Sequence, residues 1–338
     1  MDANSAPTKF GVGIIGCGNI SEIYCKNLKT FDHLTLVAVA DIDQARATAR
    51  AAQYNIEARS VYDLLNSDDV HLIVNLTIPD AHADVSRAIL KAGKHAYSEK
   101  PLATLRKDAA KILKRAKKKN LRVGGAPDTF LGGAWQTIRK LIDDGAIGQP
   151  VAATAFMVGH GPEKWHPNPD FFYQPGAGPL FDMGPYYLTA LINLFGSVKR
   201  VASLAQASFP ERYTPDGRAI PVNTPTHVAG SLEFSNGALA TLVTSFDVWH
   251  SQLPRIEIYG SEGSILAPDP NFFGGKILLR GENDQEWRDM PIEFPYTENM
   301  RGLGVADMAR SIMNNQPHRA SGEMTYHVVD VMRALLRR

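Results

Sequence analysis

The sequence of 338 residues predicts two domains of different fold class, an α/β domain in residues 1–125 and an α+β domain in residues 126–338. In the first part, short apolar runs alternate with helical segments, which is typical of a doubly wound parallel sheet. In the second part, strand-like runs follow one another without helices between them, which favours a large, mainly antiparallel open sheet. The length agrees with this division, because single hydrophobic cores seldom grow past roughly 250–300 residues.

The composition excludes several classes of protein. Hydrophobic residues make up 44% of the chain and charged residues 21%, as in ordinary globular proteins. The net charge of +1 provides no field that would attract nucleic acid or a membrane surface, so we expect neither as a partner. The N-terminus lacks the apolar segment of a signal peptide, and no apolar run approaches the roughly 20 residues that span a bilayer. We therefore expect a cytoplasmic location.

The sequence contains no recognisable disulfide or metal-binding pattern. Its two cysteines, Cys17 and Cys25, lie at a spacing that matches no metal motif and gives no disulfide framework. His160 and His166 form no ligand set with either cysteine. We therefore expect no metal site.

The first segment, residues 10–21, reads F-G-V-G-I-I-G-C-G-N-I-S. Its apolar run, Val12–Ile15, predicts a buried strand, and residues 20–28 resume at helical spacing. A glycine turn between a strand and a helix lets a pyrophosphate approach the backbone at the N-terminus of the helix. The third glycine of the usual G-x-G-x-x-G pattern is replaced by Ser21. The segment predicts a dinucleotide-binding Rossmann domain with cofactor contacts from Gly16, Gly18, Asn19 and Ile20.

The second strand, Leu34–Ala40, ends at Asp41, which lies 20 residues after Ser21. This is close to the offset expected for the acid that accepts hydrogen bonds from the adenosine ribose. A carboxylate there would repel a 2′-phosphate, so we expect NAD in preference to NADP. The alternative is that Asp41 is a turn residue, with Asp43 capping the next helix.

The remaining elements of the first domain continue the alternation. We expect strands at residues 72–76, 95–98 and 121–124, and helices at 43–52, 61–65, 108–119 and in a segment that ends at Ala92 before Gly93. In doubly wound sheets, ligands bind beyond the carboxyl ends of the strands. We therefore expect one crevice to collect the residues at four strand ends, Gly16, Asp41, Thr77 and Lys100.

Lys100 lies at the end of an expected inner strand, between Glu99 and Pro101. Pro101 fixes its own φ and restricts how the chain leaves the strand. This context would direct the ammonium group into the crevice. The alternative is a surface lysine at a strand end, and spacing alone does not decide between the two.

The boundary between the two domains falls within residues 124–128, which read G-G-A-P-D. A helix with apolar residues three and four apart comes first, namely Trp135, Ile138, Leu141 and Ile142. We then expect strands at residues 151–158, 200–207, 226–234, 238–246, 255–259, 264–267 and 276–279, with a hairpin signal at Asn236-Gly237. An open sheet needs its exposed face covered, so we expect an oligomer.

A dense patch of aromatic and polar residues fills the segment 163–187. Trp165 and His166 belong to a composition suited to stacking on a sugar ring and hydrogen-bonding its hydroxyls. Asp182 and Tyr186 follow four residues apart at the start of an apolar helix. The alternatives are that Asp182 is a capping residue and that Tyr186 is a core aromatic residue.

Together these motifs resemble the glucose–fructose oxidoreductase, inositol dehydrogenase and rhizopine catabolism family (Gfo/Idh/MocA), over nearly the whole chain. The resemblance rests on the glycine motif at Gly16, V-A-D at Val39, N-L-T-I-P-D-A-H at Asn75, A-G-K-H-A-Y-S-E-K-P-L at Ala92 and G-A-G-P-L-F-D-M-G-P-Y at Gly176. It implies an NAD- or NADP-dependent oxidoreductase that forms homodimers or homotetramers through the sheet of the second domain. It also implies further cofactor contacts from Thr77, Pro79, His82, Glu99 and Lys100.

The resemblance implies that Lys100 and Asp182 are catalytic, and two departures concern the residues around them. The histidine that usually follows the aspartate by four residues is Tyr186 here, which we interpret as a replacement acid/base. The usual asparagine–arginine turn is replaced by residues 126–129, A-P-D-T, so Asp128 is a candidate for contact with the substrate.

The function expected on these grounds is hydride transfer between the nicotinamide and a secondary hydroxyl or carbonyl group of a sugar, polyol or sugar derivative. One alternative is a redox-neutral glycosidase or lyase that oxidises a sugar ring transiently with NAD. The other is a non-enzymatic sensor of a dinucleotide and a ligand. The presence of both Lys100 and Asp182 argues against a sensor.

Overall fold

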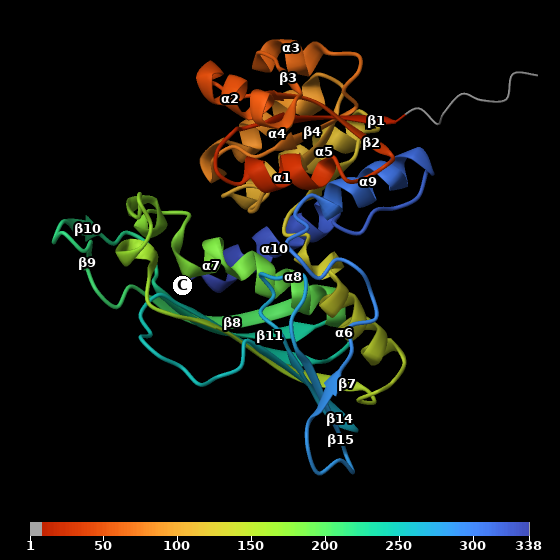
Figure 1. The fold of residues 1–338 in the computed structure, drawn as a ribbon. Coiled ribbons are helices and arrows are strands. Elements are labelled where there is room, and N and C mark those ends of the chain that lie inside the picture. Colours follow the sequence, from red (N-terminus) through yellow and green to blue (C-terminus); the bar gives the residue numbers. More distant parts are fainter. Residues whose placement is uncertain (1–8, 338) are drawn as a thin grey trace, which may run out of the picture. The chain divides into compact units, whose positions relative to one another are not determined.

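The computed structural model describes residues 9–337, which form two compact units (Figure 1). The N-terminal unit comprises residues up to 128 together with residues 299–329. The C-terminal unit comprises residues 129–298 and those from 330 onward. The division drawn from the sequence placed residues 126–338 in one domain, whereas in the structure residues 299–329 pack with the first sheet.

The N-terminal unit is built on a six-stranded sheet in the order β3-β2-β1-β4-β5-β6, and all of its strand pairs are parallel. The strands are β1 (Phe10–Ile15), β2 (Leu34–Ala40), β3 (Glu57–Ala58), β4 (Leu72–Asn75), β5 (His95–Ser98) and β6 (Val123–Gly125). The strand order reverses between β1 and β4, which is the switch point where doubly wound sheets bind ligands. The predicted doubly wound parallel sheet is confirmed.

Helices follow each inner strand of this sheet. They are α1 (Ser21–Leu28), α2 (Gln44–Tyr54), α3 (Val61–Asn66), the 3-10 turn η1 (Pro79–Ala81), α4 (His82–Lys91), α5 (Arg106–Lys118), α9 (Leu303–Met313) and the first part of α10 (Gly322–Leu335). The late segment is joined to the sheet unit by backbone contacts. Gly125 N donates to Ala320 O at 3.1 Å, and the Asn27 side chain donates to the carbonyl oxygens of Asn299 and Arg301.

The C-terminal unit is built on an eight-stranded sheet in the order β16-β15-β14-β13-β7-β12-β11-β8. The strands are β7 (Pro150–Val158), β8 (Val198–Gln206), β11 (His227–Phe234), β12 (Leu239–Ser245), β13 (Ile256–Gly260), β14 (Gly263–Ala267), β15 (Ile277–Gly281) and β16 (Arg288–Met290). Every pair is antiparallel except β12 with β7. The prediction of a large, mainly antiparallel sheet is therefore confirmed.

One face of this sheet is covered by helices, which Figure 1 shows as a green and yellow layer. The covering elements are η2 (Thr129–Leu131), α6 (Gly133–Asp143), α7 (Gly178–Asp182) and α8 (Gly184–Phe195). Alternate residues of the strands explain the layer, because Leu242, Ala155 and Ile256 share a row across three strands and are each at most 2% exposed. The same unit carries the 3-10 turns η3 (Pro162–Lys164) and η4 (Asp170–Tyr173) and a two-stranded hairpin of β9 (Glu211–Tyr213) and β10 (Ala219–Pro221).

Among the described residues, no helix combines the length and apolar character needed to cross a membrane.

Candidate functional site

The glycine turn after β1 has the backbone geometry that a pyrophosphate site requires. Gly16 has φ of +105°, and a Cβ atom there would lie 2.6 Å from the carbonyl carbon of Leu76, so only glycine fits. A Cβ atom at Gly18 would meet nothing within 4 Å, so the backbone at this position faces open space. The turn is therefore tight on the side of β4 and open where a ligand would approach.

Three consecutive backbone amides of this turn form a candidate anion-binding site. Among residues 9–337, the backbone N–H groups of Gly18, Asn19 and Ile20 have no hydrogen-bond acceptor, and α1 begins directly after them. Ser21 donates its hydroxyl and its N–H to Gly18 O, at 2.6 and 3.1 Å. The serine that replaces the third glycine therefore closes the turn rather than blocking it. The residues present fit the pyrophosphate of a dinucleotide.

The carboxylate of Asp41 is held at the end of β2 by two backbone donors. Its Oδ2 accepts from Cys17 N at 2.7 Å, and its Oδ1 accepts from Asp43 N at 2.9 Å. Each oxygen keeps a second lone pair that can accept a ribose hydroxyl. Asp43 is the N-cap of α2, because its side chain accepts from Ala45 N and Arg46 N. The cap expected at Asp43 and the oriented acid at Asp41 are thus separate features.

Cys17, within the glycine turn, is not a reactive thiol. Burial and the charge of Asp41 raise the pKa of Cys17 to about 11. Its thiol is therefore neutral at physiological pH, and its backbone N–H is the group that takes part in the turn.

The turn after β4 is tied to the end of β5 by a buried histidine. His82 is 1% exposed, with Nδ1 2.7 Å from Pro101 O and Nε2 2.9 Å from Thr77 O. Burial lowers the pKa of His82, although the two carbonyl contacts oppose this effect. Both ring nitrogens contact protein carbonyl oxygens, so His82 connects Thr77 to the Lys100–Pro101 segment and holds the two in place. The predicted direct contact of His82 with the cofactor has no support in this geometry.

Glu99 likewise organises the end of β5. Its Oε1 accepts from the hydroxyl of Tyr24 at 2.8 Å, and its Oε2 accepts from Lys100 N at 2.9 Å. Lys100 follows the strand by two residues and is half-buried. The four predicted strand-end residues, Gly16, Asp41, Thr77 and Lys100, follow the carboxyl ends of adjacent parallel strands and so share one edge of the sheet. Pro79, half-buried, opens η1 at the same edge.

Asp128 has a different surrounding from the one the sequence suggested. It is 1% exposed, and its Oδ2 accepts from Gly302 N and Gly304 N, both at 2.9 Å. These bonds satisfy two donors at the N-terminus of α9. Burial raises the pKa of Asp128 to about 6, with Glu99 contributing and the two backbone bonds opposing. Asp128 is a buried helix cap, and this position argues against the expected contact with substrate.

In the C-terminal unit, Trp165 and His166 lie on the loop between η3 and η4. Trp165 is 73% exposed, and the ring of His166 makes an edge-to-face contact with it at 5.6 Å. Asp182 ends α7 and is half-buried, while Tyr186 lies in the first turn of α8 and is 7% exposed. The N-cap residue of α8 is Met183, so Asp182 does not occupy the capping position considered above. The catalytic roles of Lys100, Asp182 and Tyr186 stay predictions.

Sequence reasoning missed a buried ionic cluster in the same unit. Arg212, Glu163 and Asp247 form ion pairs at 2.8 and 2.9 Å, and each of these side chains is at most 8% exposed. Glu163 lies inside the aromatic patch, but Arg212 and Asp247 are distant from it in sequence. No local pattern connects the three residues, so only the fold reveals them.

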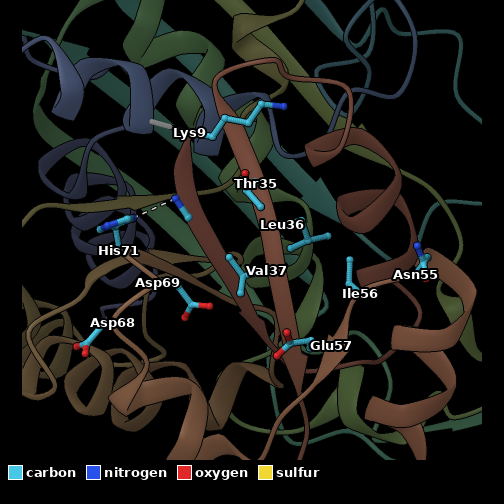
Figure 2. A pocket seen from close by; sticks show the side chains of 11 residues that line it. Lys9, Thr35, Leu36, Val37, Asn55, Ile56, Glu57, Asp68, Asp69 and His71 are labelled. Atoms are coloured by element: carbon cyan, nitrogen blue, oxygen red, sulfur yellow. Dashed lines mark hydrogen bonds between the residues drawn. The ribbon is translucent and has the colours of Figure 1, made fainter. Parts of the chain in front are cut away.

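A large open pocket lies in the N-terminal unit, away from the glycine turn (Figure 2). Its volume is about 700 Å³, and it is lined by residues at the start of β1, within β2, at the start of β3 and in the segment before β4. The charged and polar ones include Lys9, Glu57, Asp68, Asp69 and His71. His71 Nδ1 accepts from Gly11 N at 3.0 Å, as drawn in Figure 2. Because ligands of doubly wound sheets bind beyond the carboxyl ends of the strands, we place the cofactor at the glycine turn and not in this pocket.

Comparison with known proteins agrees with these features. The model "Oxidoreductase family, NAD-binding Rossmann fold" matches residues 10–125, and "GFO/IDH/MocA C-terminal domain" matches residues 135–266. The chain is 24% identical over 318 residues to myo-inositol 2-dehydrogenase of Thermotoga maritima. The aligned region covers 92% of this chain and 91% of the relative.

Two solved structures show the same fold. An NAD binding oxidoreductase from Klebsiella pneumoniae has a TM-score of 0.85 at 21% identity. Levoglucosan dehydrogenase in complex with NADH and L-sorbose has a TM-score of 0.84 at 20% identity. Each match covers 97% of this chain and 96% of the other. With both family models matched in order along the sequence, and the glycine turn and strand-end residues in place, the chain belongs to the Gfo/Idh/MocA family of oxidoreductases.

Proposed function

We propose that the protein is an NAD-dependent dehydrogenase that transfers a hydride between the nicotinamide and a secondary hydroxyl or carbonyl group of a sugar, polyol or sugar derivative. The observation that supports the proposal most directly is the arrangement of residues at the carboxyl ends of the strands of the first sheet. There, three unpartnered amides, an oriented carboxylate and a lysine follow neighbouring parallel strands. The similarity to a myo-inositol dehydrogenase and to a levoglucosan dehydrogenase supports sugars and polyols as the substrate class.

The cofactor contacts divide between two groups of residues. The amides of Gly18, Asn19 and Ile20 would bind the pyrophosphate, and Asp41 would accept the two ribose hydroxyls. A 2′-phosphate would be repelled by the Asp41 carboxylate, which is why we propose NAD rather than NADP. When bound, the nicotinamide accepts or supplies the hydride, and the protein provides orientation and the route for the proton.

Proton transfer is assigned to three side chains. Oxidation of a secondary alcohol releases a hydroxyl proton, and we assign Lys100 to hydrogen-bond the reacting oxygen and stabilise its anionic character. Asp182 and Tyr186 complete the proposed set, with Tyr186 as the acid/base and Asp182 orienting it or accepting the proton through water. The positioning of Lys100 by Glu99 and His82 supports its assignment, because a catalytic group must be held in a defined orientation.

Assembly through the second sheet is part of the proposal. On the face of the sheet that carries no helices, Leu204, Ala229, Val243 and Phe156 form one row across four strands. Leu204 is 84% exposed, and the other three are half-buried. An apolar row on an uncovered sheet face is a typical subunit contact, so we propose a homodimer or homotetramer formed through this face.

The test is a substrate screen followed by one substitution. Sugars, inositols and sugar acids are incubated with NAD and, separately, NADP, and the absorbance of the reduced cofactor is followed. We expect NADH to accumulate with at least one neutral sugar or polyol. Conversion of a sugar without net NADH would instead identify a redox-neutral enzyme.

For the best substrate, Lys100→Met should reduce turnover by about 1000-fold or more, because the group that stabilises the reacting oxygen is lost. NADH should still bind, as measured by its fluorescence. Lys91→Met, at the exposed end of α4, is the matched control and should behave as the parent protein. Near-parental turnover in Lys100→Met would overturn the assignment.

A further inference from the structure

Arg212, on β9 of the hairpin, is the centre of the buried cluster in the C-terminal unit. Its Nε and Nη2 donate to Glu163 Oε1 at 3.0 and 2.8 Å, and its Nη1 donates to Asp247 Oδ1 at 2.9 Å. Nη2 also contacts Phe246 O and His160 Nε2, each at 3.0 Å. The side chain is 5% exposed, so these bonds are shielded from water. One planar guanidinium therefore connects three separate segments of the chain.

The two carboxylates transmit this connection to different elements. Glu163 lies in η3, and its Oε2 accepts from the hydroxyl of Tyr173 in η4. Asp247 follows β12, and its Oδ2 accepts from the hydroxyl of Thr226 at 2.6 Å. Burial alone would raise the pKa of Glu163, but the bonds from Tyr173 and Arg212 lower it below its ordinary value. Glu163 is thus a fixed anion that closes the base of the loop from η3 to η4.

The loop that this base supports carries the exposed rings of the aromatic patch. Trp165 is 73% exposed and Phe171 is 48% exposed, and His166 makes edge-to-face contacts with both rings. Beneath them, the side chains of η4, β10 and the segment after β12 form a small apolar core of Phe172, Tyr173, Ile220 and Phe246. The exposed rings are therefore supported by two features beneath the loop, namely the buried ionic cluster centred on Arg212 and the small apolar core to which the hairpin contributes Ile220.

We propose that Arg212 is a positioning residue for sugar recognition, which fixes the loop from η3 to η4 so that Trp165 and His166 are presented to the sugar ring. The inference rests on the proposed function for its substrate and on the cluster geometry for its mechanism. A lysine would keep the charge but would supply three donors from one nitrogen, which do not reproduce the planar set that reaches Glu163, Asp247 and Phe246.

The hairpin offers a matched control in Arg218. This residue pairs with Asp170 of the same loop through two bonds of 2.7 and 2.9 Å, but both side chains are about half exposed. Exposed pairs contribute little to the position of the groups they join. Replacing Arg218 therefore removes an arginine from the same hairpin and the same loop without opening the buried base.

The experiment compares Arg212→Lys with Arg218→Lys on the best substrate of the screen. We expect the KM for the sugar to rise about tenfold or more in Arg212→Lys, with kcat within about threefold of the parent, because displaced rings weaken sugar binding. The affinity for NADH should not change, since the glycine turn belongs to the other unit. Arg218→Lys should keep the parental KM. A merely structural role for Arg212 would reduce the yield of active enzyme and leave the KM unchanged, which would overturn the proposal.

A second variant and a second measurement keep the test decisive if Arg212→Lys folds poorly. Glu163→Gln keeps the size of the side chain and leaves the Arg212–Asp247 pair intact, so we expect a KM increase of about threefold or more. Fluorescence anisotropy decay of Trp165, taken as the difference from Trp165→Phe in each background, should show faster local motion in Arg212→Lys but not in Arg218→Lys. Unchanged loop motion in Arg212→Lys would contradict the positioning role. This readout needs no substrate, so it also separates failure of the inference from failure of the proposed function.

Discussion

Asp41 is oriented before any cofactor binds, because the backbone N–H groups of Cys17 and Asp43 hold its two oxygens. Such preorganisation reduces the entropy lost when the ribose hydroxyls are bound. If the adenosine ribose binds at Asp41 as proposed, this carboxylate places a negative charge where the 2′-phosphate of NADP would lie. We therefore propose that Asp41 is the side chain that discriminates between the two cofactors.

Asp41→Ser should lower the affinity for NAD about tenfold or more, since hydrogen bonds to a charged group contribute roughly 1.5–3 kcal/mol. The affinity for NADP should rise relative to that for NAD. Both are measured as dissociation constants by fluorescence titration. Asp43→Ser is the matched control, because serine also caps helices and the ribose contact is untouched. An unchanged ratio of the two constants in Asp41→Ser would show that Asp41 does not contact the ribose.

Asp128 makes the stability of the N-terminal unit depend on pH. Because burial raises its pKa to about 6, the folded state holds the proton more tightly than the unfolded state between about pH 4 and 6. Stability therefore falls as the pH rises through this window, by roughly 3 kcal/mol for a shift of about two units. Asp128→Asn should remove this decrease, since the amide oxygen can still accept from Gly302 N and Gly304 N.

The measurement is the free energy of unfolding in urea at several pH values for both proteins. Groups that do not interact with Asp128 titrate equally in the two proteins, so the difference between the curves reports on Asp128 together with its interaction with Glu99. Parallel curves between pH 4 and 7 would contradict the buried, proton-holding state of this carboxyl group.

Asp128 also shows why residue-scale predictions fail where partners are remote. The sequence presents an acid beside an altered turn, which suggested a substrate contact. Its true partners, the amides at the start of α9, lie 174 and 176 residues further along the chain. By contrast, the offset of Asp41 from the glycine turn is visible in the sequence, and its backbone partners, Cys17 and Asp43, lie 24 and 2 residues away from it.

At the scale of elements, the two glycines of the turn after β1 have different roles. The fold requires glycine at position 16, because the positive φ of Gly16 and its closeness to Leu76 leave no room for a side chain. Gly18 has open space beside it, so we assign it to the approach of the ligand. Ser21 takes the third position, where its hydroxyl closes the turn onto Gly18 O.

Gly16→Ala should lower the free energy of unfolding by roughly 1–3 kcal/mol, the usual cost of a strained backbone conformation for a residue with a side chain. Gly18→Ala should keep the parental stability but weaken NADH binding, because the added methyl group occupies the space into which the pyrophosphate approaches. Urea unfolding and NADH titration of both variants separate the two effects. The reverse result, with Gly18→Ala unstable and Gly16→Ala defective only in binding, would contradict the assignment.

Elements bounded by local signals were the ones that the sequence predicted well. β2 and β5 begin and end at the predicted residues. β2 is an apolar run that ends before Asp41, and β5 lies between the helix-ending Gly93 and the Glu99-Lys100-Pro101 segment. The hairpin of β9 and β10 and the helix α9 were missed. Their stability comes from remote contacts, namely Arg212 with Glu163 and Asp128 with α9, which no local periodicity records.

At the scale of the whole molecule, the two predicted sheet classes are correct because they follow from how strands and helices alternate along the chain. What alternation cannot show is how the late segment 299–329 returns to the first sheet. The burial pattern, however, distinguishes the two faces of the second sheet. Val228 and Leu242 on the helix-covered face are 2% exposed, whereas Leu204 on the other face is 84% exposed.

Leu204→Lys tests the proposed use of that uncovered face. A side chain this exposed in one chain contributes little to its folding, so the substitution should leave the stability of the separate subunit nearly unchanged. If the face joins two subunits, the new charge would be buried against an apolar row, and the assembly should dissociate at least about tenfold more readily. Sedimentation velocity over a concentration series measures this. Tyr62→Lys, an exposed residue of α3 in the N-terminal unit, is the control and should sediment as the parent. A parent protein that sediments as a monomer, or an unchanged assembly in Leu204→Lys, would exclude this face as the subunit contact.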